Sequence, residues 1–189
     1  MYVQDMNVSP GDVIVAPPHM QDPRFARTVL MVTHETNHGH FALCLNRPTE
    51  HTVNDISDEV GIELYPDCPM YWGGPVNPQT VWMLHSNEWC IDQTINIDEH
   101  WSMTSNRSMF HEIAHGNVPE RFRVSFGFAG WAQGQLEREL QGEPPLDHKS
   151  SWLIWRNPDP DLLIDTAPQD LWRVATEHCA QQWAQGVFI

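Results

Sequence analysis

Two histidines and a glutamate near the middle of the chain have the spacing of a metallopeptidase motif. On a helix, His111 and His115 would lie one turn apart on one face and could bind zinc, and Glu112 could activate a zinc-bound water. Such a site needs a third ligand, for which Glu137 is the candidate. A glycine and a proline follow His115 closely, however, and would end the helix there. We therefore expect no metal at this motif and keep a zinc-dependent hydrolase, or metallopeptidase, as the alternative function.

A second group of histidines flanks one turn. His34, His38 and His40 could share a metal ion with His19 or His51, but their spacing matches no standard zinc site and no cysteine joins them. We expect these residues to form a polar hairpin tip. The glycine motifs of nucleotide-binding loops and the serine elbow of hydrolases are also missing, so we expect no cofactor and do not favour an enzyme.

Charge and composition exclude several kinds of partner. The chain has 189 residues and a formal net charge of −15, which opposes direct binding to nucleic acid or to an anionic membrane surface. It contains no apolar run of about 18 residues and no secretory signal, so we expect a cytoplasmic protein. The four cysteines are widely spaced, which predicts free, mostly buried thiols rather than disulfides.

The elements that must position these residues are strands mixed irregularly with helices. Alternating or β-branched segments predict strands, and apolar residues at helical spacing predict helices. We expect Ser105 to cap one helix and Thr166 to start the last, with Trp183 continuing its apolar repeat. The expected strands are 12–16, 28–33, 41–45, 70–75, 80–85, 91–97 and 121–128, and the expected helices are 52–62, 105–115, 132–141 and 166–185. This order predicts one α+β domain over 1–189, with the C-terminal helix packed on it.

Four separated segments resemble the YqgE/AlgH family. They are APPHMQDPRF at 16–25, LNRP at 45–48, YWGGPV at 71–76 followed by VWMLH, and GFAGW at 127–131 followed by GQLE at 134–137 and Glu139. The chain departs from the family pattern at Ala42, at an extra proline after Ala16, and in a longer loop at 142–151. The resemblance implies an α+β fold with a coiled, mostly antiparallel or mixed sheet and several flanking helices. Family members are often labelled candidate transcriptional regulators, but no helix-turn-helix with a basic face is visible here.

These segments also supply a candidate binding site, because they place glycine turns and polar or aromatic side chains at strand ends. Asn46 and Gln135 could orient a polar ligand, Arg47 could pair with an anion, and Trp131 could form a stacking wall. The alternative is that the same residues shape turns and fill the core. We expect a ligand-binding, protein-binding or regulatory module whose partner and oligomeric state the sequence leaves open. Its candidate residues are Asn46, Arg47, Pro48, Gly73, Gly74, Trp131, Gln135 and Glu139.

Overall fold

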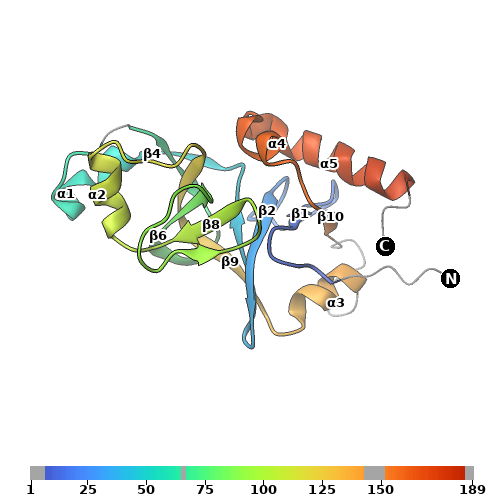
Figure 1. The fold of residues 1–189 in the computed structure, drawn as a ribbon. Helices are drawn as coiled ribbons and strands as arrows, with labels where there is room; N and C mark the ends of the chain where they lie inside the picture. Colours follow the sequence, from blue (N-terminus) through green and yellow to red (C-terminus); the bar gives the residue numbers. More distant parts are fainter. Residues whose placement is uncertain (1–6, 65–66, 143–151, 186–189) are drawn as a thin grey trace.

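A computed structural model describes residues 7–64, 67–142 and 152–185 and shows a curled β-sheet flanked by helices (Figure 1). The strands are β1 Val13–Val15, β2 Val29–Thr36, β3 Gly39–Cys44, β4 Pro48–Thr52, β5 Pro69–Trp72, β6 Val76–Ser86, β7 Ile95–Asn96, β8 Trp101–Thr104, β9 Phe122–Ala132 and β10 Leu153–Trp155. The helices are η1 Val53–Ile56, α1 Ser57–Val60, α2 Ser108–Ala114, α3 Gln135–Gln141, α4 Pro160–Asp165 and α5 Pro168–Ala184. No helix in these ranges is both long and apolar enough to cross a membrane. The α+β class is confirmed.

Strand β9 joins the two parts of the sheet. The main path runs β10-β1-β2-β3-β9-β6-β8-β7, and β4 and β5 form a branch that attaches to β9. All the pairings are antiparallel except that between β5 and β9. The first half of β9 lies between β5 and β6, whereas its second half pairs with β3. The turns at both ends of β9 are therefore fixed relative to three neighbouring strands.

Apolar residues on both faces of this sheet are buried under helices. Helix α5 contributes Leu171, Ala175 and Cys179 to a cluster with β1, β2 and β3, which confirms that the C-terminal helix packs on the sheet. The predicted apolar repeat does not reach Trp183, which is 70% exposed in the last turn of α5. Thr166 does not start this helix either: Ala167 is its N-cap, and no side chain bonds the cap.

Helix α2 is shorter than the predicted helix 105–115. It begins at Ser108, and the backbone N–H of that residue donates to Oδ1 of Asn106 at 3.0 Å. Ser105 was expected to cap the helix, but the N-cap is Arg107, which makes no side-chain cap bond, because Ser105 directly follows the extended strand β8. The side chain of Asn106 bonds the turn before the helix instead. The helix ends at Ala114 with His115 as its C-cap, as the glycine after it predicted.

Three other predicted elements have different bounds in the structure. The predicted helix 132–141 begins only at Gln135, because β9 continues to Ala132 in order to pair with β3. The predicted strand 91–97 is reduced to the two residues of β7, and the predicted helix 52–62 is a 3-10 turn followed by one α-helical turn. The strands β4, β8 and β10 and the helix α4 were not predicted.

Candidate functional site

The asparagine of the LNRP segment is held by the backbone of a neighbouring loop. Its Oδ1 accepts a hydrogen bond from the backbone N–H of Val29 at 2.9 Å, and its Nδ2 donates to the carbonyl of Arg27 at 2.9 Å. Asn46 thus fastens the start of β2 to the end of β3. Pro48 is the first residue of β4. Within the described residues this strand pairs with β5 on one edge, so a proline, which has no N–H to donate, can face the other edge.

Arg47 holds the same loop from its other side. Its Nη2 donates to the carbonyls of Pro23 and Ala26 at 3.1 and 3.0 Å, and its guanidinium lies over the ring of Trp72 at 5.1 Å. The cation is therefore partly covered, and an arriving anion would compete with two carbonyls for it.

The glycines of the GGP segment allow two backbones to approach closely. Gly73 donates to the carbonyl of Phe126 at 2.9 Å and accepts from the N–H of Cys44 at 2.9 Å. A Cβ on Gly74 would overlap the backbone of β9, and a Cβ on Gly127 would overlap the carbonyl oxygen of Gly74. Gly127 also has a φ of +71°, a conformation that favours glycine. Both glycines are required by packing at this crossing.

A carboxylate holds the start of α3. Oε2 of Glu139 accepts from the indole N–H groups of Trp131 and Trp152 at 2.9 Å each, and its Oε1 accepts from Nε2 of Gln135 at 2.8 Å. Oε1 of Gln135 in turn accepts from the N–H of Ala132 at 3.0 Å. This network holds α3 against the end of β9 and against Trp152, the residue just before β10.

The predicted site segments do come together, around Phe25. Its ring centroid lies 6.3 Å from that of Trp72, 6.5 Å from that of Trp131 and 5.8 Å from that of Trp152. The LNRP, GGP and GW segments therefore adjoin, and the polar groups described above bond within the protein. This arrangement is that of a scaffold.

The structure does not assemble the alternative zinc site. The rings of His111 and His115 stack at 5.8 Å on the exposed side of α2, and Nδ1 of His115 contacts the carbonyl of His111 at 2.7 Å. Glu137 lies on α3, at the opposite end of the molecule (Figure 1), next to His40. A carboxylate at that position cannot complete a site on α2, and nothing in the described ranges supports the metallohydrolase.

A groove of about 760 Å³ opens beside the GGP segment, between η1 and β6. The register between β6 and β9 shifts between Val76 and Val81, and Asn77 has a φ of +45°. The extra residues bulge out of the ladder and form one wall. The apolar floor consists of Met70 from β5, Val81 from β6 and Phe126 from β9.

The polar rim of this groove is mainly acidic. It carries Asp55 and Glu59 from η1 and α1, Gln79 from the bulge and His51 from β4, and none of the described lysines or arginines lines it. Nδ1 of His51 lies 3.5 Å from Oδ2 of Asp55. The groove thus offers apolar contact below and negative charge above.

The three histidines around the β2–β3 turn have different environments. His34 stacks on Phe41 at 4.4 Å, His38 is exposed, and His40 is buried, so the expected polar tip is wrong for His40. The cause is that β3 pairs with β9 as well as with β2, which encloses His40 between two strands under α3. Sequence reasoning missed Glu35, although the turn at 37–38 places it opposite His40 in the ladder.

Burial changes the proton affinity of two side chains in the sheet. Burial raises the pKa of the Cys44 thiol to about 11 and lowers the pKa of His85, an effect that the carbonyl of Ser86 and the charge of Glu88 partly oppose. His85 lies edge-on to Trp89 at 4.9 Å, and its Nδ1 contacts the carbonyl of Ser86 at 3.0 Å. Burial therefore favours the uncharged form of both side chains, which does not suit them to acid–base chemistry.

Comparisons with known proteins agree with this architecture. A family model described as AlgH-like matches residues 13–184. A UPF0301 protein from Methylococcus capsulatus is 32% identical over 168 residues, which cover 87% of this chain and 85% of that protein. The solution structure of AlgH from Pseudomonas aeruginosa superimposes with a TM-score of 0.71 at 29% identity and covers 91% of each chain. A crystal structure from Corynebacterium diphtheriae, at 24% identity and a TM-score of 0.68, covers 88% of this chain and 84% of its own and shares the fold.

Proposed function

The chain belongs to the AlgH-like family of uncharacterised proteins, and from this membership together with its own geometry we propose that it is a binding module for a small organic cation. The ligand would lie in the groove between η1 and β6, with its apolar body on the floor and its charged group at the rim. The observation that carries this proposal is the combination of an apolar floor with a rim that has two carboxylates and, among the described residues, no lysine or arginine.

The floor and the rim would have separate roles. Met70, Val81 and Phe126 come from three adjacent strands, so they form a rigid apolar surface of the kind that lines small-molecule sites. Asp55 and Glu59 lie on consecutive helical turns and would face one cationic group. A volume of about 760 Å³ falls within the range of roughly 300 to 1,000 Å³ for ligand pockets.

We propose that the sequence-predicted site residues position this groove instead of lining it. Gly73 and Gly74 allow the close crossing with β9 from which the bulged part of β6 departs. Asn46, Arg47 and Pro48 fix the point at which β4 begins, and β4 brings His51 to the rim. The network around Glu139 holds the other end of β9.

The broader role that we propose is regulatory and cytoplasmic, exerted through ligand binding rather than through DNA. The net charge of −15 and the acidic rim both oppose contact with a polyanion. A family label of transcriptional regulator would then describe an indirect effect.

An NMR titration tests the groove. Phenethylamine is added to methyl-labelled protein at physiological salt, with phenylpropionate as a probe of similar body and opposite charge. We expect saturable shifts of the Met70 and Val81 methyl groups with the amine and weaker ones with the acid. Asp55→Asn should weaken amine binding by up to about fivefold, the limit for one exposed ion pair. Asp58→Asn, exposed on the adjoining helix α1 but outside the groove lining, should not weaken it. Equal binding of both probes, or no shift at these methyl groups, would rule out the proposal.

A further inference from the structure

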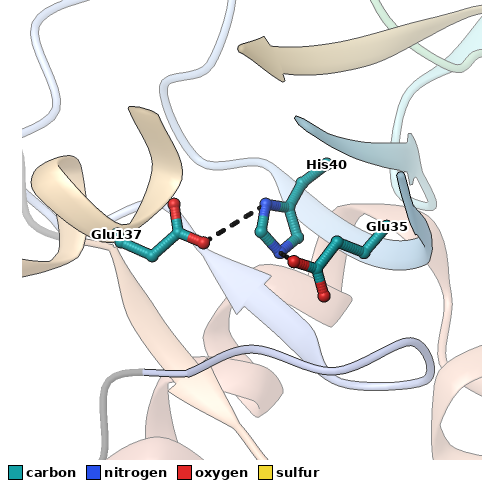
Figure 2. Close-up of side chains that lie close together, drawn as sticks. All are labelled: Glu35, His40 and Glu137. Carbon is teal, nitrogen blue, oxygen red and sulfur yellow. Dashed lines mark ion pairs between the residues drawn. The ribbon is translucent and has the colours of Figure 1, made fainter. Parts of the chain in front are cut away.

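A second hollow, of about 390 Å³, lies at the turn end of the β2–β3 hairpin, away from the groove. Glu35 and His40 are register partners in this hairpin, so their side chains lie on the same face of the sheet. Trp131 of β9 is the partner of His40 on its other side. Helix α3 crosses this face, and Figure 2 shows Glu137 approaching His40 from one side while Glu35 approaches from the other.

His40 is buried between these two carboxylates without a hydrogen-bond partner for Nδ1. Its side chain is 4% exposed. Nδ1 lies 3.6 Å from Oε1 of Glu137, and Nε2 lies 3.8 Å from Oε1 of Glu35, both beyond hydrogen-bond distance. The other oxygen of Glu137, Oε2, is also buried and unpartnered. Two buried polar atoms without partners in one place are costly unless something bonds to them.

We propose that Glu35, His40 and Glu137 bind a divalent transition-metal ion such as Zn²⁺. One donor atom from each of the three side chains lies within 4.8 Å of those of the other two. An imidazole with two carboxylates is a donor set that zinc and its neighbours accept. Nδ1 is the histidine donor, because it is the buried atom that lacks a partner and faces Glu137.

An ion on Nδ1 fits once the carboxylate of Glu35, whose printed contact is with Nε2, moves toward it. Ligands about 2.0 to 2.2 Å from a tetrahedral ion lie roughly 3.3 to 3.6 Å from one another. Nδ1 of His40 and Oε1 of Glu137 already have this separation, at 3.6 Å. The side chain of Glu35 is 57% exposed at the end of β2, so it is free to turn toward the ion.

The scaffold around Glu139 gives this site its rigidity. Gln135 and Glu139 fix the first turns of α3, and Glu137 lies between them. Three protein ligands leave at least one position of a tetrahedral ion open, and that position would face the hollow beside Thr36 and Gln133. Water or a small ligand would occupy it.

Zinc titration of the full-length, tag-free protein tests this site. We expect one tight equivalent of Zn²⁺ in wild type and in His111→Asn, a variant that removes the exposed histidine pair on α2. Glu137→Gln and Glu35→Gln should weaken binding by no less than the roughly 10- to 100-fold that loss of an outer-shell partner costs. His40→Asn should abolish it, and His38→Asn, an exposed neighbour, should leave it unchanged.

The spectroscopic readout identifies the donor atoms. The ¹⁵N signal of His40 Nδ1 should shift on addition of zinc, and Co²⁺ in place of zinc should give visible d–d bands that Glu137→Gln removes. The two carboxamide variants keep the shape of the side chains and are checked for folding by circular dichroism, so a loss of binding cannot be ascribed to unfolding. Absence of zinc binding in wild type, or zinc binding that survives His40→Asn and disappears in His111→Asn, would overturn the proposal.

Discussion

Replacing Glu139 with alanine should destabilise the protein strongly, because this carboxylate is the acceptor for two buried indoles. Trp131 and Trp152 are 5% and 6% exposed, and their N–H groups donate to the same carboxylate oxygen. A buried donor left without an acceptor costs about 1 to 3 kcal/mol, so the pair predicts a loss of about 3 to 4 kcal/mol in the free energy of unfolding. Gln135 is less buried and can turn to water.

A glutamine at the same position gives a graded comparison. Its carbonyl oxygen can accept from both indoles, but its amide nitrogen would face the amide nitrogen of Gln135, so we expect Glu139→Gln to cost about 1 kcal/mol. Glu177→Ala is the matched control, because this glutamate is exposed and forms an ion pair with Arg173 at 2.9 Å, so its loss should cost no more than about 0.5 kcal/mol.

The assay is urea unfolding followed by far-UV circular dichroism, together with the indole N–H resonances of Trp131 and Trp152. In thermal unfolding, where 1 kcal/mol corresponds to roughly 2 to 4 °C for a chain of this size, Glu139→Ala should lower Tm by about 10 °C. The two indole protons should move upfield in the alanine variant and much less in the glutamine variant. If both variants unfold within about 1 kcal/mol of wild type, the carboxylate does not hold α3 and the reasoning is refuted.

Three further predictions concern the backbone crossing at Gly127, the thiols and His85. Gly127→Ala, whose Cβ would overlap a carbonyl, should cost about 3 kcal/mol or more in urea unfolding, against about 1 kcal/mol for Gly61→Ala, which has the same φ but open space. In a thiol-labelling time course at pH 8, exposed Cys90 should react within minutes, whereas Cys44, with its pKa raised to about 11, should react only on unfolding. Because burial lowers the pKa of His85, the unfolded state takes up the proton first, so its contribution to stability is complete above pH 6.5 and is lost as the pH falls toward the folded-state pKa. His85→Phe should flatten the dependence of urea stability on pH below 6.5, and an unchanged slope would contradict this assignment.

The elements that could be predicted from the sequence are those whose pattern is local. The segments 28–33 and 121–128 have runs or alternation that only a strand explains, and all but the first residue of each lies in β2 or β9. The class of the fold and the family resemblance are confirmed as well. The start of α3 was misplaced because pairing with β3, a tertiary contact, extends β9 to Ala132. Strand β10 has three residues and exists because it pairs with β1.

The candidate sites were predictable to different degrees. The pairing of Glu35 with His40 across the hairpin follows from the turn between them and could have been predicted. The approach of Glu137 could not be predicted, because it depends on the angle at which α3 packs, which a network with Trp152 from a distant segment sets. The groove likewise depends on a register shift between β6 and β9, which no local sequence pattern predicts.

The double attachment of β9 has a consequence for how the chain acquires its structure. Because β9 pairs with β3, β5 and β6, none of the three can complete its ladder until residues 122–132 have been synthesised. Most contacts of the sheet therefore connect distant parts of the chain, which slows folding relative to helical proteins of equal length. Amide hydrogens in the centre of β9 should exchange only through global opening, so the strand that contributes Phe126 to the groove is also the last part of the sheet to be released.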